Sequence, residues 1–145
     1  MEEILLLLRE GYYALLNNMV VEGKQIQVYD MQAPANTKPP YVTIGNMSWI
    51  SENTKDTFGG RVLVNLKVHG EYLGDFGGRK PTDLIAAKIL KLVIPSPGRS
   101  GVQRTGIDVI MARLDESDDS HNWYTTGREY TRSLTIEHIV WESNS

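Results

Sequence analysis

The strict alternation of apolar and polar residues between residues 61 and 72 constrains the fold more than any other feature of this chain. Its apolar members are Val62, Val64, Leu66 and Val68. A period of two is typical of a β-strand with one buried face. The preceding residues 41–52 are also strand-like, and the polar connection 53–60 ends in two glycines. The sequence therefore predicts a long antiparallel hairpin over residues 39–72.

The outgoing strand of this hairpin alternates less strictly than the returning one. If its alternation runs unbroken, Val42, Ile44 and Ile50 share one face, with polar residues between them. Pro39 and Pro40 cannot donate a main-chain hydrogen bond to a ladder, so we expect both prolines to precede the strand.

Two segments repeat apolar residues at spacings of three and four, which predicts amphipathic helices over residues 2–20 and 81–93. Gly11 lies inside the first helix, where glycine costs about 1 kcal/mol relative to alanine. A close approach of another backbone would explain that glycine. Lys88 and Lys91 are expected to face outward near the end of the second helix, where the helix dipole favours positive charge.

The remaining segments are predicted from composition and spacing. Residues 25–29 read as a short strand, and residues 30–40 as an extended loop that contains three prolines. Residues 107–114 are apolar on both faces, which predicts a strand inside the sheet. An acidic loop over residues 115–122 and a last long strand over residues 123–142 follow.

This order of elements predicts an α+β fold. We expect a single antiparallel or mixed β-sheet with long hairpins, packed against the N-terminal helix and the second helix on one face. The 145 residues predict one domain that spans residues 1–145. The acidic start of the chain is unlike a secretory signal, and the apolar run near it is far shorter than the ~20 residues of a membrane span.

Composition narrows the function classes. The chain has no cysteine, which excludes a disulfide scaffold, a thiol nucleophile and cysteine-ligated zinc. The formal net charge of −3 argues against a bulk nucleic-acid binder. The three histidines, His69, His121 and His138, lack metal-ligand spacing, and no nucleophile elbow surrounds any serine. We therefore expect no enzyme activity, no metal and no cofactor.

The acidic loop resembles a calcium-binding loop only in part. Asp115, Ser117 and Asp119 have the alternate spacing of calcium ligands. However, Ser120 replaces the turn glycine, and Thr126 stands where a bidentate glutamate is required. A solvated loop is the favoured interpretation.

Aromatic and basic residues near this loop suggest a protein interface. Trp123 and Tyr124 flank the loop, and aromatic residues are enriched in interfaces, although packing at a strand end explains them equally well. The basic residues of the C-terminal half are Arg99, Arg104, Arg128 and Arg132. They are interpreted either as solvated surface or as partners for the acidic loop of a neighbouring copy.

The order of segments resembles the tail-completion or tail terminator proteins of long-tailed bacteriophages, which are also called head–tail joining proteins. The likeness covers about residues 1–142. It rests on the leucine-rich first helix, Val28-Tyr29-Asp30 before a proline-bearing loop, the run Pro40-Tyr41-Val42-Thr43-Ile44-Gly45, the long returning strand, a helix around residues 83–89 and two long C-terminal strands. The chain departs from the pattern at His69-Gly70, where a tryptophan is expected, and in a longer link at residues 74–80.

The resemblance implies a structural role in the virion, at the tail end near the neck, after assembly in the cytoplasm of a host bacterium. Such proteins form a ring, typically of six copies, that caps the tail tube, stops its polymerisation and offers the head–tail joining surface. The implied partners are other copies of the chain, the tail tube protein and the head-connector or head-closure protein. Genomic DNA would pass through the ring without specific binding, and no membrane is involved.

The polar connection over residues 53–60 and the acidic loop over residues 115–122 are the candidate contact surfaces, and we expect them at opposite ends of the subunit. The candidate interface residues are Asn53, Lys55, Asp56, Phe58, Arg61, Asp115, Glu116, Asp118, Asp119, Trp123, Tyr124 and Arg128. Two other functions stay open at this stage. One is another phage neck, head-closure or tail-tube component. The other is a small enzyme or ligand-binding α+β domain, which requires a pocket with convergent polar groups.

Overall fold

The computed structural model describes residues 3–51, 59–73, 80–124 and 127–143, with the side chains of residues 72–73, 121–124 and 127–128 left aside. In chain order the elements are α1 (Ile4–Leu16), β1 (Val20–Val21), β2 (Lys24–Gln25), β3 (Gln27–Asp30), β4 (Tyr41–Ser51), β5 (Gly59–Leu73), α2 (Lys80–Val93), β6 (Ile107–Tyr124) and β7 (Gly127–Glu142).

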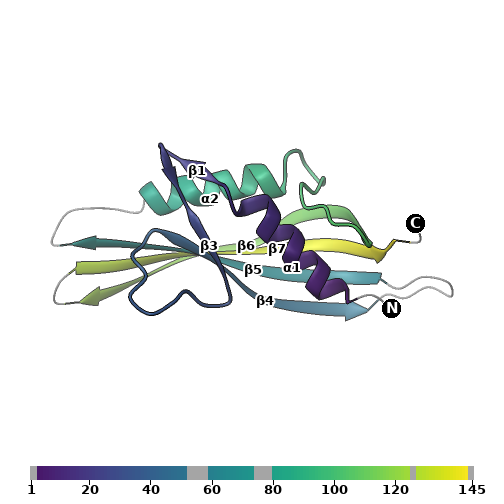
Figure 1. Cartoon of the computed structure of the whole chain (residues 1–145), viewed down its shortest axis with the longest axis horizontal. Helices are drawn as coiled ribbons and strands as arrows, with labels where there is room; N and C mark the ends of the chain where they lie inside the picture. Colours follow the sequence, from purple (N-terminus) through teal and green to yellow (C-terminus); the bar gives the residue numbers. More distant parts are fainter. Residues whose placement is uncertain (1–2, 52–58, 74–79, 125–126, 144–145) are drawn as a thin grey trace.

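The molecule has two layers, a long twisted sheet and a layer that contains both helices (Figure 1). The five strands of the sheet lie in the order β3-β4-β5-β7-β6. β3 pairs with β4 in parallel, and the other neighbours are antiparallel, so the sheet is mixed. β1 and β2 form a separate two-stranded ribbon. The predicted α+β class, with both helices on one face, is confirmed.

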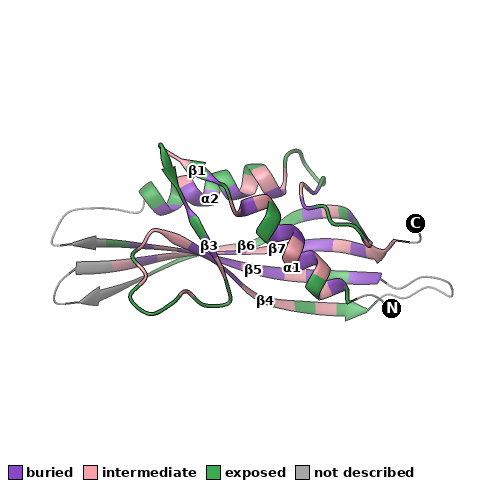
Figure 2. Cartoon of the chain, in the orientation of Figure 1, coloured by how far each residue is buried: buried purple, intermediate pink, exposed green. Residues whose placement is uncertain are grey.

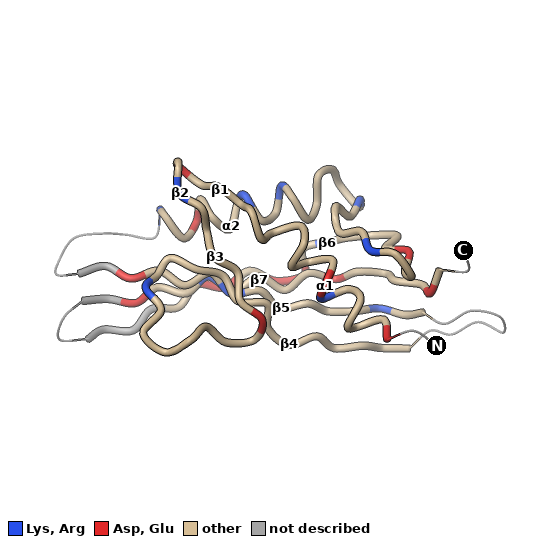
Figure 3. The backbone as a smooth tube through the Cα atoms, in the orientation of Figure 1, with Lys and Arg blue, Asp and Glu red and all other residues tan. Residues whose placement is uncertain are grey.

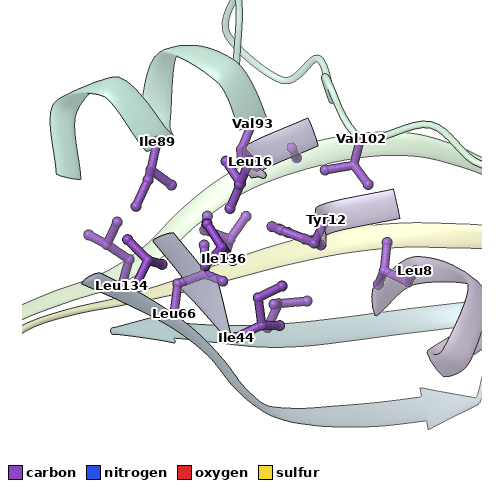
Figure 4. Close-up of a cluster of buried hydrophobic side chains, with 14 of the residues drawn as sticks. Leu8, Tyr12, Leu16, Ile44, Leu66, Ile89, Val93, Val102, Leu134 and Ile136 are labelled. Carbon is purple, nitrogen blue, oxygen red and sulfur yellow. The ribbon is translucent and has the colours of Figure 1, made fainter. Parts of the chain in front are cut away.

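The core lies between the helices and the sheet face that they cover, which we call the helix face; the opposite side is the open face (Figure 2). The buried apolar residues on the helix face of the strands are Val42, Ile44, Val62, Val64, Leu66, Val68, Val109, Ala112, Leu134, Ile136 and Val140. Their partners from the helices include Leu8, Tyr12, Leu16, Ile89 and Val93, which meet them in Figure 4. The apolar alternation of the returning strand is thereby confirmed.

The predicted hairpin of β4 and β5 is present, but one face of its outgoing strand was assigned wrongly. The β4–β5 register shifts between Ile44 and Met47, as at a β-bulge. An extra residue in one strand reverses the side-chain alternation beyond it. Met47 and Trp49 therefore pack against the core, while Ile50 is 59% exposed. The connecting residues 52–58 lie outside the described residues.

The first helix is shorter than predicted, because α1 ends at Leu16 and Val20 already belongs to β1. Its glycine is explained as expected. A Cβ atom on Gly11 would lie 3.0 Å from Val102 Cγ1 and 3.2 Å from the carbonyl oxygen of Gln103. The segment that joins α2 to β6 therefore packs directly against the backbone of α1. The second helix agrees with its prediction to within one residue, and Lys88 and Lys91 are exposed.

The last hairpin differs most from the prediction. β6 is an edge strand, and β7 takes the interior position between β5 and β6. The residues predicted as an acidic loop continue β6 to Tyr124, in register with β7 from Glu116 opposite Thr135 to Tyr124 opposite Gly127. The second apolar face of β6 stays uncovered, since Ile110 is 57% exposed. The helices cover only one face of the sheet, so an apolar pattern on both faces did not mark a central strand.

Gly101 anchors the crossover from α2 to β6. Its amide donates a hydrogen bond of 2.7 Å to the carbonyl of Val93, and a Cβ atom there would overlap the carbonyl oxygen of Leu92. We expect Gly101→Ala to lower the free energy of unfolding by about 1–3 kcal/mol, because the main chain must move to admit the methyl group. Urea denaturation measures the change. Ser96→Ala, at an exposed position of the same crossover, is the control, and equal stability of the two variants would contradict the expectation.

Candidate functional site

The acidic segment, defined as Asp115, Glu116, Asp118 and Asp119, lies along the outer edge strand of the sheet. Partners across an antiparallel ladder share a face. Glu116 and Asp118 stand opposite Thr135 and Ser133 on the open face. Asp119 stands opposite Arg132 on the helix face. The segment therefore presents carboxylates on both sides of one strand.

Two of these carboxylates crowd one another. A side-chain hydrogen bond with Asp118 raises the pKa of Glu116, and the negative charges of Asp118 and Asp115 act in the same direction. No described residue forms an ion pair with Asp115, Glu116 or Asp118. Asp115, Glu116 and Asp118 thus carry negative charge that the described part of their own chain leaves uncompensated.

Arg132 connects the acidic segment to the helix layer. Its Nε donates to the Ser117 hydroxyl at 2.8 Å, and its Nη1 donates to Asp83 Oδ1 on α2 at 2.7 Å. The same Nη1 lies 3.5 Å from Asp119 Oδ1. The sequence allows Arg132 to be solvated surface or the partner of an acidic loop in a neighbouring copy. In the structure it instead links α2, β6 and β7 within one chain. The residues are far apart in sequence, so no local signal pointed to the link.

The open face next to this segment is polar and hydrogen-bonded across the strands. Asn65 Nδ2 donates to the Ser133 hydroxyl at 2.9 Å. Thr43 Oγ1 lies 3.0 Å from His69 Nε2. Arg113 pairs with Glu137 at 3.2 Å. The side chains of these three pairs satisfy one another, so they are not available to bind a small molecule.

Three rings gather at one end of the open face. Tyr41 stacks on His69 with centroids 4.6 Å apart, and Tyr29 meets Tyr41 edge-on at 5.8 Å. Burial raises the pKa of Tyr41, and Glu129 adds to that effect. Burial lowers the pKa of His69, while the same glutamate opposes it. The rings cover one another, which accounts for them as packing of the sheet face.

A second histidine is locked in the core instead. His138 points from β7 into the helix face, and its Nε2 meets the hydroxyl of Tyr12 from α1. Its Nδ1 lies 3.0 Å from the carbonyl oxygen of Met111, which can only accept, so Nδ1 carries the proton and Tyr12 donates to Nε2. Burial lowers the pKa of His138 to about 4 and raises that of Tyr12. His69 and His138 face opposite sides of the sheet, so they do not approach one another.

The structure places the other predicted site residues only in part. Asn53, Lys55, Asp56 and Phe58 lie outside the described residues. Arg61 is exposed on the open face near the start of β5, opposite Ile50 and Ile139. The remaining three predicted residues, Trp123, Tyr124 and Arg128, belong to β6 and β7, and their side chains are not described. Arg61 and the acidic segment are thus on different parts of the sheet.

The described residues contain no cluster of histidine, aspartate and glutamate that could hold a metal ion. Three cavities of the described residues do not gather titratable groups with shifted pKa values either. One cavity of about 360 Å³ lies between the β1–β2 ribbon, the two prolines before β4 and the start of α2. Neither its lining nor that of two shallower hollows includes Tyr12, Tyr41, His69, Glu116 or His138. Among the described helices, none is long and apolar enough to cross a membrane.

Comparison with known proteins identifies a fold relative. The chain matches no protein-family model, and no curated protein matches it. Among solved structures, it resembles a chain in the virion of a native gene transfer agent (GTA) particle. The two superpose with a TM-score of 0.72 at 16% sequence identity, over 97% of this chain and 99% of that chain. At this identity the likeness shows a shared fold, which extends over nearly the full length of both chains.

Proposed function

We propose that this chain is a structural component of a phage-like virion and that it acts as a tail terminator. In this role it caps the tail tube as a ring of six copies, as in the family it resembles in sequence, ends tail polymerisation and provides the head–tail joining surface. The observation that carries the proposal is the full-length fold likeness to a virion chain. The order of sequence segments points independently to the tail terminator family.

The described chemistry supports a role in assembly instead of catalysis. The groups with shifted pKa values are divided between the buried Tyr12–His138 pair, the aromatic cluster on the open face and the acidic segment. Catalytic sites bring such groups together in one cavity, within hydrogen-bond reach of a substrate. A sheet whose open face carries polar side chains together with the exposed Ile50 and Ile110, beside a charged edge strand, is better suited to contacts with other proteins.

The proposed joining surfaces follow the length of the sheet. β4 ends at Ser51 and β5 begins at Gly59 at one end of the sheet, and β6, which carries the acidic segment, runs toward the other end (Figure 1). We propose that these two regions of the subunit provide the contacts through which the ring assembles and joins the tail tube to the head connector. DNA would pass through the ring without being held, for which the formal net charge of −3 is suitable.

Negative-stain microscopy of particles made without this chain tests the proposal. Full heads beside separate, unjoined or overlong tails are the expected result. Leaking heads beside tails of normal length would replace the tail terminator with a head-closure protein of the neck. Normally joined particles would overturn a structural role at the head–tail junction altogether.

A point variant tests the acidic segment directly. Replacing Asp115, Glu116, Asp118 and Asp119 with alanine should leave the protein folded, because all four side chains are on the surface, and should strongly reduce the number of joined particles. Counts of joined particles by microscopy, with circular dichroism of the purified variant, provide the measurement. Glu71→Ala with Asp108→Ala removes exposed carboxylates elsewhere on the sheet and should join normally. Full joining by the four-residue variant would exclude the segment from the joining surface.

A further inference from the structure

The exposed side of α2 carries an excess of positive charge. Lys80, Lys88 and Lys91, which we call the basic stripe, are exposed, and α2 buries Ile85 and Ile89 on its other side. At 100° per residue, Lys80 and Lys91 lie three turns apart on one side of the helix, and Lys88 lies one turn before Lys91. Figure 3 shows the basic positions along α2. No described residue forms an ion pair with any of the three lysines.

Local effects do not account for the whole stripe. The helix dipole favours Lys88 and Lys91 near the C-terminal end of α2, but it disfavours Lys80 at the first residue. The single acidic residue of α2 is Asp83, and its carboxylate is already paired with Arg132. The stripe therefore presents three positive charges that the described part of the molecule leaves uncompensated.

The uncompensated negative charge lies on the opposite side of the molecule from the basic stripe. Glu116 and Asp118 project from the open face of the sheet, whereas the basic stripe projects outward from the helices that cover the opposite face. The two surfaces cannot neutralise each other within one chain. They can do so between two copies if the open face of one copy meets the helix layer of the next.

The edge strand β6 also favours a contact with a different surface over pairing with a second β6. Its register with β7 shifts at two places, between Val109 and Met111 and between Leu114 and Glu116. Bulges and charged residues are the features that keep edge strands from pairing with their own kind. Two β6 edges side by side would bring like-charged acidic segments together, which is unfavourable. A symmetric dimer through β6 is therefore disfavoured, and a contact with a basic surface is favoured.

We propose that copies of this chain associate head to tail, with the acidic segment on β6 of one copy seated on the basic stripe of α2 in the next. The contact joins two different surfaces, so it closes into a ring where the rotation between copies allows and otherwise continues as a filament. The inference deepens the proposed function and rests on it, because a ring that caps a tube needs a contact of this heterologous kind. The occupant of each surface is a second copy of the chain.

Charge reversal tests the contact in the purified full-length chain by sedimentation velocity. The wild-type chain should self-associate, and the association should weaken as NaCl rises from about 0.05 M to about 0.5 M, since surface charges are screened within a few ångströms at high salt. Glu116→Lys with Asp118→Lys, or Lys88→Glu with Lys91→Glu, should each weaken association at low salt by about tenfold or more, because like charges then face one another.

Combining the variants provides the decisive comparison. The chain with all four substitutions, and an equimolar mixture of the two double variants, should both recover association, because opposite charges face each other again. Glu71→Lys with Asp108→Lys makes the same change in net charge at other exposed positions and should associate like the wild type. Circular dichroism confirms that each variant is folded.

Several results would overturn the proposal. The first is a wild-type chain that stays monomeric up to its solubility limit. The second is self-association that neither charge reversal weakens. The third is a combined variant that does not recover self-association. Binding of a DNA duplex that is lost with the lysine variant, while self-association is unchanged, would assign the basic stripe to nucleic acid instead. Particle morphology separates this contact from the proposed function. If the purified chain self-associates as expected but particles made without the chain are normally joined, the tail-terminator role is refuted and the contact between copies stands.

Discussion

Acidification from pH 7 to pH 4 is expected to remove about 3 kcal/mol from the free energy of unfolding through His138 alone. Burial lowers the pKa of this imidazole from 6.5 to about 4 in the folded chain, and each pH unit between those values is equivalent to about 1.4 kcal/mol. The unfolded chain takes up the proton first, so the contribution is fully present above pH 6.5 and is lost as the pH falls toward 4. Urea midpoints measured across this range give the slope.

His138→Gln is the informative variant, because it removes the titrating group and keeps a side chain that can hydrogen-bond. Its stability at pH 7 is expected to fall, but the dependence on pH between 6.5 and 4 should largely disappear. His69→Gln is the control, since His69 is only partly buried on the open face and should leave most of the slope in place. An unchanged slope in His138→Gln would show that other groups cause the acid sensitivity.

The largest effect of truncating a single side chain is expected for Leu66→Ala. Leu66 is fully buried in the middle of β5, in register with Ile44 on one side and Leu134 on the other, and all three lie beneath the helices. The loss of its side chain removes apolar contacts and leaves a cavity that neighbouring strands cannot fill. We expect the free energy of unfolding to drop by about 2–5 kcal/mol, as measured by urea denaturation.

Leu63→Ala provides a matched control on the same strand. This substitution removes the same atoms from a leucine on the open face, where the side chain is only partly buried. The control should cost clearly less than Leu66→Ala because less apolar surface returns to water and no closed cavity forms. Equal losses for the two variants would mean that the open face is covered in solution. That outcome would itself favour a partner seated on it.

The proposals for the two charged surfaces depend on what the folded chain brings together. Arg132 neutralises Asp83 and approaches Asp119, and in doing so it leaves the basic stripe and the rest of the acidic segment without a partner among the described residues. The sequence suggests arginines of the C-terminal half as partners for an acidic loop of another copy. The structure assigns Arg132 to an internal link and moves the candidate basic partner to α2.

Much of the fold could be predicted because its determinants are local. The alternation from Val62 to Val68 and the helical spacing in α1 and α2 each reflect a requirement of one segment for one buried face. Hydrophobic burial is the main contribution to folding, and it depends on the period of apolar residues along the chain. For this reason the α+β class, the first hairpin and the face that Leu66 buries could be inferred from the sequence alone.

Only the tertiary structure determines the features that depend on distant pairing partners or on a single residue that shifts the register. The bulge between Ile44 and Met47 moves Ile50 from the predicted buried face to solvent, and its local signals, Gly45 within the strand and apolar Met47 and Trp49 beyond it, do not by themselves fix the register. The acidic residues of β6 form a strand because main-chain hydrogen bonds to β7 require no apolar side chains at an open edge. His138 meets Tyr12 across 126 residues of sequence. The sequence determined which faces must be buried; only the packed structure determined which strand lies at the edge and which charges remain for a partner.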